Sequence, residues 1–275
     1  MNDLPNDDSP IKENLDLLIE TLKNDPDWNK RFGAASRLFR SGKEKAIDPL
    51  INALQNDSHK EIRRFCADLL GNLGDPRATW ALVAAFRQAI AEKDAILIHH
   101  TTEALLKIRG PDLSGILIST VTDTGELLEV RIISLELLGK LADNIAVKGL
   151  IDIIKNPHTD GKIRAKAIEE LVYTGNLAGL QLILDQLEVT KRKDFQIVVI
   201  RAINKTPFRN KTIVFRIGEI LLFISEQEQQ KGERKDTEII NLIAETMGIL
   251  AKNINYDFKQ FMDELISIRN MKKKK

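Results

Sequence analysis

The chain has 275 residues, of which 43% are hydrophobic, and this apolar content excludes a wholly disordered protein. Its 41 basic and 40 acidic residues leave a net charge of +1, which excludes a uniformly basic nucleic-acid coat and a uniformly acidic tail protein. Aromatic residues make up only 5% and charged residues 29%, a composition typical of many packed helices rather than of sheets.

The chain opens with an acidic segment, and we expect residues 1–10 to form a disordered acidic arm. This segment lacks the basic and apolar regions of a signal peptide, and the longest apolar runs, such as residues 220–224, are too short to span a bilayer. The single cysteine, Cys66, cannot form a disulfide within the chain and suits a reducing compartment. We therefore expect a cytoplasmic protein without membrane contact.

One local pattern recurs five times. A compact residue stands three positions after the opening residue and a leucine seven positions after it, so both lie on one stripe of a helix. Glycine or alanine follows at the eleventh position, where glycine is typical of a helix end. The opening residues are Arg31, Arg63, His99, Arg131 and Arg164; the compact residues are Ala34, Cys66, Thr102, Ser134 and Ala167; the leucines are Leu38, Leu70, Leu106, Leu138 and Leu171; the terminal residues are Gly42, Gly74, Gly110, Ala142 and Gly175.

A second set of apolar helices recurs in the same rhythm, beginning near Leu50, Leu82, Leu117, Leu150 and Ile183, with Leu17 one period earlier. Short polar turns with Asp or Asn separate the helices and can cap the one that follows. A single helix pair cannot bury apolar stripes on both of its sides, so neighbouring pairs must stack. The sequence therefore predicts an all-α fold, an α-solenoid of about six to seven helix pairs.

Three of these segments resemble HEAT repeats of the short type found in phycobilisome-lyase-like proteins: EIRRFCADLLGNLGDPRA (61–78), EVRIISLELLGKLAD (129–143) and KIRAKAIEELVYTGN (162–176). The resemblance covers about residues 12–190 and implies a right-handed superhelix of paired helices. Members of that family are mostly adaptors and scaffolds that bind partners on a curved surface. A minority are chromophore lyase subunits, and related helical-repeat folds include a DNA glycosylase and a metal-dependent hydroxylase.

The pattern is expected to fail from Lys191, because Lys205 takes the place of the leucine and Arg209 the place of the glycine. Residues 191–216 contain eight basic residues and one acidic residue, Asp194, a local charge of +7. Such a cluster can steer an acidic protein or a nucleic acid, or it can be a solvated face over core phenylalanines. The basic residues are Lys191, Arg192, Lys193, Arg201, Lys205, Arg209, Lys211 and Arg216.

The last part of the chain predicts a helix over residues 213–224, an exposed polar loop over 225–238, and helices over 238–252 and 257–270. In the final helix the stripe of Phe258, Phe261 and Leu265 suits a cap over the last repeat, and residues 272–275 suit a frayed lysine tail. We thus expect regular repeats over 11–190, irregular basic repeats and a loop over 191–253, and a capping helix with its tail over 254–275.

We expect no catalytic, cofactor-binding or metal-binding residues. His99 and Glu103 share a helix face, but they supply only half of the ligands that a helical metal site requires. In the other copies the opening position holds arginine, whose cation is best explained by pairing with a turn Asp such as Asp57 or Asp160 or with a nearby helix C-terminus. Cys66 stands in the compact position and is expected to be a core residue rather than a reactive thiol. Trp28 and Trp80 lie outside the basic cluster, which argues against capture of a nucleobase.

With catalysis and metal binding disfavoured, binding of a partner remains as the expected function. The second helices of stacked pairs usually line the concave surface, and positions five and nine after each opening residue would form a ridge there. This ridge pairs Ser36 with Arg40, Asp68 with Asn72, Ala104 with Ile108, Glu136 with Lys140, and Glu169 with Tyr173. An apolar centre with flanks of mixed charge suits a protein or peptide better than a phosphate backbone.

The sequence thus predicts a non-catalytic scaffold or adaptor that binds a protein on its concave surface, with the basic cluster as a secondary docking patch for an acidic partner. Two alternatives stay open. One is a subunit of a bilin lyase-like enzyme, which the family resemblance alone supports. The other is a helical-repeat protein that binds nucleic acid through the basic cluster.

Overall fold

The computed structural model describes residues 14–273, which form fifteen α-helices, three short 3-10 helices and no strand. The all-α prediction is confirmed for these residues, whereas the predicted disordered arm lies outside them. The α-helices are α1 (Leu15–Asn24), α2 (Trp28–Gly42), α3 (Ile47–Asn56), α4 (Lys60–Leu73), α5 (Thr79–Ala91), α6 (Ala95–Ile108), α7 (Leu113–Thr122), α8 (Leu128–Leu141), α9 (Asn144–Lys155), α10 (Gly161–Tyr173), α11 (Leu177–Val189), α12 (Lys193–Lys205), α13 (Lys211–Gln230), α14 (Thr237–Asn253) and α15 (Phe258–Lys273).

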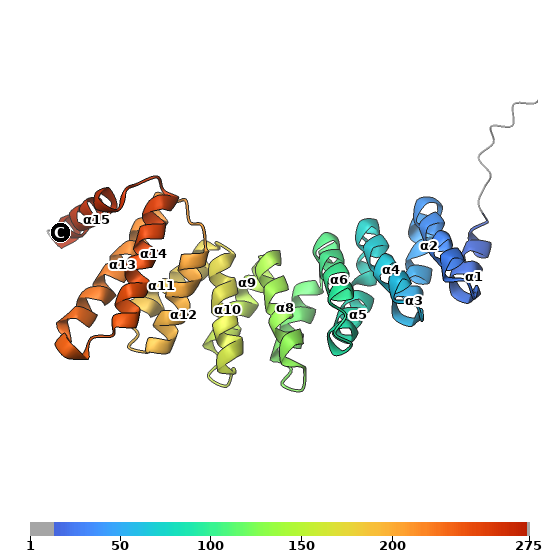
Figure 1. Cartoon of the computed structure of the whole chain (residues 1–275), viewed down its shortest axis with the longest axis horizontal. Helices are drawn as coiled ribbons and strands as arrows, with labels where there is room; N and C mark the ends of the chain where they lie inside the picture. Colours follow the sequence, from blue (N-terminus) through green and yellow to red (C-terminus); the bar gives the residue numbers. More distant parts are fainter. Residues whose placement is uncertain (1–13, 274–275) are drawn as a thin grey trace, which may run out of the picture. The chain divides into compact units, whose positions relative to one another are not determined.

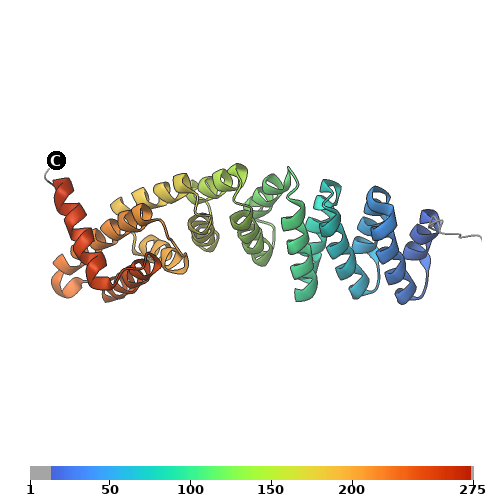
Figure 2. The same cartoon turned by 90° about the horizontal axis from the view of Figure 1, so that it is seen from above.

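The chain divides after Leu113 into two compact units. In the first unit α1, α3 and α5 alternate with α2, α4 and α6, and each helix packs against the other helix of its pair and against helices two places away (Figures 1 and 2). In the second unit the alternation runs from α7 to α14, and α15 packs on α13 and α14. Within the described residues the first unit thus has three helix pairs, and the second has four helix pairs and a final helix, the arrangement of an α-helical repeat in each unit.

The core follows the predicted stripe in four of the five copies. Leu38, Leu70, Leu138 and Leu171 are fully buried, and so are the compact residues of the same copies, among them Cys66. The third copy differs, because Thr101 and Leu105 are fully buried whereas Thr102 and Leu106 are only half-buried. The opening residue of this copy is therefore Ile98 and not His99.

The helix ends confirm this shift by one residue. The residue eleven places after the opening position is left-handed in the second, third, fourth and fifth copies, with φ of 70° at Gly74, 47° at Arg109, 50° at Ala142 and 65° at Gly175. The prediction that Gly110 ends the third copy was wrong, since its φ is not positive. Gly110 is instead close to Thr79, whose Oγ1 would lie 2.6 Å from an added Cβ.

The predicted failure of the pattern at Lys191 was also wrong. Helix α12 begins at Lys193, and its fourth residue, Gln196, is buried like the opening arginines. Val199 and Ile203 stand three and seven positions later and are fully buried. A sixth copy therefore follows Arg164 after 32 residues, with Gln in place of Arg and Ile in place of Leu.

The C-terminal part is more helical than the sequence pattern indicates. Helix α13 extends to Gln230, so much of the predicted loop is helical, and Glu228 is buried where it accepts a hydrogen bond from the Asp236 amide. In α15, Phe261 and Leu265 are fully buried and Phe258 is 50% exposed. The capping prediction therefore holds for two of its three residues. Lys272 is helical and contacts Glu219 at 2.8 Å, so it does not belong to a frayed tail.

Candidate partner-binding surface

The opening residue of a repeat closes the turn between its two helices. In the first copy Arg31 Nη1 donates to the carbonyl of Asp25, 2.9 Å away, just after α1 ends. Four other copies repeat this bond to a carbonyl near the end of the preceding helix: Arg63 to Asp57 at 3.2 Å, Arg131 to Val121 at 2.8 Å, Arg164 to Asn156 at 2.9 Å and Gln196 to Thr190 at 3.2 Å. The third copy opens on Ile98, which has no side-chain donor. The opening residue thus has the structural role that the sequence predicts.

Two of these arginines also bind a carboxylate from the next helix pair. Arg31 contacts both oxygens of Asp57 at 2.8 Å, and this hydrogen bonding raises the pKa of Arg31 against the opposing effect of burial. Arg63 contacts Glu92 at 3.0 Å. The predicted pairing is therefore confirmed for Asp57. Asp160 instead caps α10 by accepting from Lys162 and Ile163, and these bonds are the main reason that its pKa is lowered.

The predicted ridge is accessible in all copies except the third. Its side chains at Arg40, Asn72, Lys140 and Tyr173 are exposed, and those at Ser36, Asp68, Glu136 and Glu169 are half-buried. Ala104 and Ile108 are buried, with Ile108 only 9% exposed, so the predicted apolar centre was wrong. The error follows from the shifted opening residue, and the third copy presents Glu103 and Lys107 in their place.

Polar contacts join the ridge positions of adjacent helix pairs. In the first unit, Asp68 lies 2.7 Å from His100 Nδ1, and Lys107 Nζ donates to Asn72 at 2.9 Å. In the second unit, Lys166 contacts Glu136 and Glu170, both at 2.9 Å, and Lys205 contacts Glu169 at 3.7 Å. Burial raises the pKa of Glu170, and the Lys166 ammonium opposes this shift. The ridge is thus a charged surface with a repeating arrangement.

Helix α2 extends the ridge with aromatic side chains. Trp28 and Phe32 precede Ser36 and Arg40 at intervals of four residues, which places all four on one helix face. Trp28 and Phe32 are each 38% exposed. Trp28 stacks on His59 with ring centroids 4.3 Å apart, and Phe32 stacks on Phe65 at 4.0 Å. We call Trp28, Phe32, His59 and Phe65 the aromatic patch.

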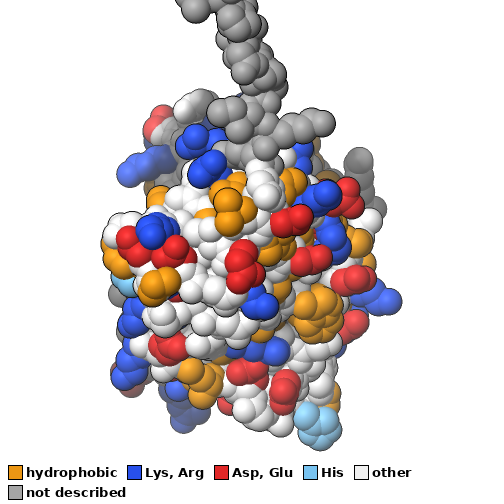
Figure 3. All heavy atoms as spheres, turned by 90° about the vertical axis from the view of Figure 1, so that its right-hand side faces the viewer, with side chains coloured by type: hydrophobic (Ala, Val, Ile, Leu, Met, Phe, Trp, Pro, Cys, Tyr) orange, Lys and Arg blue, Asp and Glu red, His pale blue; other side chains and the backbone are white. Residues whose placement is uncertain are grey.

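Sequence reasoning missed this patch, although the spacing of Trp28 and Phe32 ahead of the ridge is a signal that could have found it. The patch belongs to the end of the chain where α1 and α2 lie. At this end Figure 3 shows acidic, basic and apolar side chains mixed on the surface, without a large area of one sign. An apolar anchor among mixed charges suits a protein partner.

The basic cluster is largely paired with acidic residues from other helices. Lys193 contacts Asp236 at 2.7 Å, and Arg216 contacts Glu188 at 2.7 Å. Further contacts join Arg201 to Glu238 at 3.4 Å, Arg192 to Asp194 at 2.6 Å, and Lys211 to the ring of Tyr256 at 4.8 Å. Lys191 and Arg209 have no ion pair within the described residues. The local charge of +7 is therefore offset in space by carboxylates from α10, α11 and α14.

The phenylalanines of the cluster belong mainly to the core, as the structural interpretation predicts. Phe208 and Phe215 are buried, and Phe195 is half-buried at the edge of a cavity. The prediction that Cys66 is a core residue is confirmed, and its burial raises the pKa of the thiol. Trp80 is 64% exposed on α5.

His99 is exposed at the surface, whereas its neighbour His100 bonds to Asp68. Over residues 14–273, His, Cys, Asp and Glu side chains nowhere form a group of three that could hold a metal ion. No helix in the same range is long and apolar enough to cross a membrane.

Residues 15–105 match a family model described as HEAT repeats. This part of the chain consists of HEAT repeats. The match covers the helix pairs of the first unit, from α1 into α6, and it confirms the predicted resemblance over these residues.

Two solved structures resemble the HEAT-repeat chain at low similarity. One is the complex of CpcE and CpcF of phycocyanin lyase from Nostoc, with 17% identity, a TM-score of 0.36, and coverage of 90% of this chain and 99% of that chain. The other is human deoxyhypusine hydroxylase in complex with glycerol, with 16% identity, a TM-score of 0.38, and coverage of 89% and 96%. No curated protein matches the sequence. Likenesses this weak carry no argument about activity.

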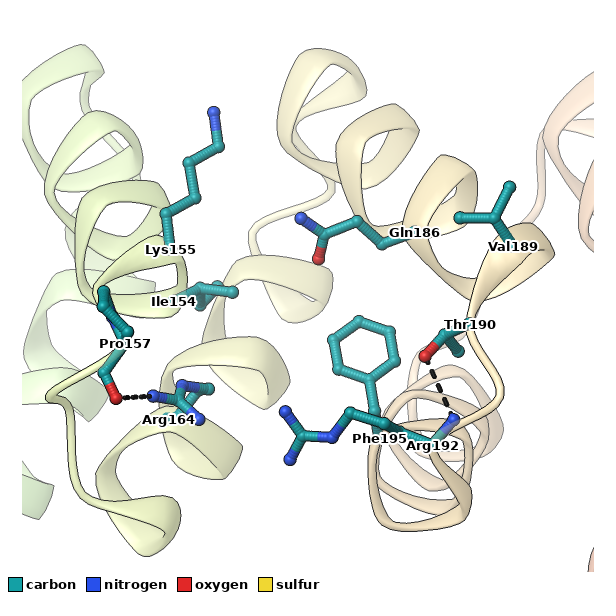
Figure 4. A pocket seen from close by; sticks show the side chains of 9 residues that line it. All are labelled: Ile154, Lys155, Pro157, Arg164, Gln186, Val189, Thr190, Arg192 and Phe195. Carbon is teal, nitrogen blue, oxygen red and sulfur yellow. Dashed lines mark hydrogen bonds between the residues drawn. The ribbon is translucent and has the colours of Figure 1, made fainter.

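A cavity of about 430 Å³ lies between the fifth and sixth repeats. Figure 4 shows its lining, in which the side chains of Arg164 and Arg192 lie on either side of the space and the Phe195 ring stands beside Gln186. A smaller cavity of about 130 Å³ adjoins it and shares Arg164, Arg192 and Phe195. The larger volume lies within the range of about 300–1,000 Å³ that is usual for ligand pockets.

Proposed function

We propose that this HEAT-repeat chain is a non-catalytic scaffold or adaptor that binds a protein partner on the face of its second helices. This face is the concave side in most stacked helix pairs. The proposal includes a cytoplasmic location, because a single buried thiol suits a reducing compartment.

The aromatic patch is the observation that carries the proposal. Trp28 and Phe32 expose apolar area while His59 and Phe65 hold their rings in place from the next repeat. Rigid, exposed aromatic side chains lose little conformational entropy on binding, and Trp is enriched among the residues that dominate interface energies. The ridge residues Arg40 and Asn72 supply the polar rim that such an anchor needs.

The ridge adds selectivity. Because acidic and basic side chains alternate along it, a partner with complementary charges is favoured and a partner with mismatched charges is rejected. Each compact unit carries its own part of the ridge in this proposal: Arg40, Asp68, Asn72, Glu103 and Lys107 in the first unit, and Glu136, Lys140, Glu169 and Tyr173 in the second.

The basic cluster serves in this proposal as a secondary docking surface for an acidic protein segment. Lys191 and Arg209 support this role, since they are exposed and carry no ion pair within the described residues. Lys193, Arg201 and Arg216 contribute less to this docking surface, because carboxylates from other helices already offset their charge.

A capture experiment with matched tryptophan variants tests the proposal. The tagged full chain, the double variant W28A/F32A and the control W80A are used to capture proteins from the source lysate, followed by quantitative mass spectrometry. Trp80 is exposed on α5, a first helix, so W80A removes the same chemistry from the other face. We expect at least one protein to be captured by the wild type and W80A and reduced about tenfold or more with W28A/F32A.

Circular dichroism establishes that the three chains are equally folded. Equal capture by all three would overturn the proposal that the second-helix face holds the partner.

A further inference from the structure

The first two HEAT-repeat junctions share one contact. A carboxylate that stands six residues before the opening position of a repeat binds the opening arginine of the preceding repeat. Asp57 does so to Arg31 with two contacts of 2.8 Å, and Glu92 does so to Arg63 at 3.0 Å. The contact fills the space between the two turns and neutralises a guanidinium that is mostly buried.

The junction between the fifth and sixth repeats lacks this carboxylate. The equivalent position is Thr190, six residues before Gln196. Thr190 keeps the local turn of Asp57, since its Oγ1 accepts from the amide of Arg192 as Asp57 accepts from that of His59. It offers no negative charge to Arg164.

Arg164 consequently has carbonyl partners only. Its Nη2 donates to the carbonyls of Asn156, Pro157 and Thr159 at 2.9 to 3.1 Å, and its Nε is buried without a hydrogen-bond partner. The Nε of Arg63 is also buried without a partner, but Arg63 has Glu92 on its Nη2. Among the described residues no carboxylate bonds to Arg164, and the cavity of about 430 Å³ opens at this place (Figure 4).

The lining of the cavity combines positive charge with an apolar wall. Lys155, Arg164 and Arg192 supply three cations, and Ile154, Val189 and Phe195 supply the apolar surface. Its lining contains no acidic residue, and the adjoining smaller cavity contains Asp194, which pairs with Arg192 at 2.6 Å. The sum over these four charged side chains is positive, so the cavity attracts an anionic group.

We propose that this cavity binds an acidic side chain of a partner peptide, with a neighbouring apolar side chain against Phe195 and Val189. The partner's carboxylate takes the position toward Arg164 that Asp57 takes toward Arg31, and Arg192 adds a second cation. The inference deepens the proposed scaffold function and rests on it, because the peptide belongs to the bound protein.

Two peptides and three variants of the full chain test this site. The probe is an acetylated and amidated peptide of six residues in which Phe precedes Glu between Ser and Gly residues, and the control peptide has Gln in place of Glu. Binding is followed by ¹H–¹⁵N NMR of the full chain. We expect shifts around residues 154–157 and 186–195 with the Glu peptide, and affinity for the Gln peptide lower by about tenfold.

The variant T190D supplies the missing carboxylate within the chain. We expect it to pair with Arg164, to raise the thermal midpoint and to abolish peptide binding. R192Q removes the exposed cation and is expected to weaken peptide binding about tenfold without a change in the fold. R234Q removes an exposed arginine outside both the cavity and the basic cluster and is expected to bind as the wild type does.

Three results overturn the inference: no binding of the Glu peptide, equal binding of both peptides, or wild-type binding by a folded R192Q. Should T190D fail to fold, R192Q decides. The capture experiment with W28A/F32A tests the second-helix face, and its result does not depend on the result of the peptide titration. If the Glu peptide binds but W28A/F32A captures as much protein as the wild type, the proposal for the cavity stands and that for the second-helix face is overturned. If W28A/F32A loses capture but the Glu peptide does not bind, the proposal for the second-helix face stands and that for the cavity is overturned.

Discussion

Arg31 Nε and Nη2 each lie 2.8 Å from an oxygen of Asp57, so one bidentate contact joins the first two HEAT repeats. The side chains are 10% and 4% exposed. In the variant D57N the turn bond to the His59 amide can persist, but Arg31 loses its counter-charge in a buried position. We expect a loss of about 3 kcal/mol in the free energy of unfolding, measured by urea denaturation.

The exposed pair of Arg192 and Asp194 provides the control for this prediction. Their side chains are 62% and 69% exposed, so D194N should lower the free energy of unfolding by less than about 1 kcal/mol. Similar losses in D57N and D194N would show that burial does not strengthen the junction contact.

A close approach of two helices explains a glycine in the middle of α4. A Cβ added to Gly71 would lie 2.7 Å from the backbone Cα of Ala104 in α6, whereas one added to Gly33 in α2 would have no atom within 4 Å. We expect G71A to destabilise the chain by about 1–3 kcal/mol through steric overlap. G33A should stabilise it by up to about 1 kcal/mol through helix propensity. Thermal melting measures both effects, and a change of the same sign in the midpoints of G71A and G33A would contradict this account.

The stability of the second unit should depend on the protonation of Glu170. Burial raises the pKa of this carboxyl above its ordinary value of 4.5, so the folded chain binds the proton more tightly than the unfolded chain. The resulting stabilisation is fully present below pH 4.5 and is lost as the pH rises through the folded pKa. Relative to E170Q, the wild type should therefore lose stability as the pH rises above 4.5.

The Lys166 ammonium limits this effect, because it favours the ionised carboxylate. In K166M the pKa of Glu170 should rise further, and the loss of stability relative to the double variant K166M/E170Q should extend to higher pH. Urea unfolding at several pH values measures both effects. A wild-type profile parallel to that of E170Q would contradict the assigned role of burial.

The repeat architecture could be predicted from the sequence because burial imposes the same spacing in each copy. Leu38, Leu70, Leu138 and Leu171 show that spacing directly. The third copy misled the alignment, since two leucines in succession, Leu105 and Leu106, fit the pattern equally well in two registers. Only packing distinguishes them, because Leu105 is fully buried and Leu106 is not.

The sixth copy and the binding features could be predicted less well. Gln196 reaches the carbonyl of Thr190 as an arginine would, but a pattern that requires a cation overlooks it. The charge of the basic cluster was overestimated, because the carboxylates of Asp236 and Glu188 come from helices distant in sequence. The cavity lies beside Arg164, to which no carboxylate bonds among the described residues, and this relation becomes visible only when the junctions are compared in space.

Charge reversal separates docking from folding in the basic cluster. Lys205 has one long contact to Glu169 and Arg209 has no ion pair within the described residues, so K205E/R209E should change the thermal midpoint little. We expect weaker capture of an acidic partner by this variant than by K252E/K259E, which reverses two exposed lysines elsewhere. Loss of folding in K205E/R209E would show that the cluster is structural.

The final helix should stabilise the second unit through one side of its apolar surface. Phe261 is fully buried, its ring lies 5.3 Å from that of Phe215, and it also packs against Gly218. F261A should therefore lower the free energy of unfolding by about 3–5 kcal/mol through a cavity over α13. Phe258 on the same helix is 50% exposed, and F258A should cost less than about 1 kcal/mol. Equal losses in urea denaturation would mean that α15 does not cap the last repeat through the Phe261 face.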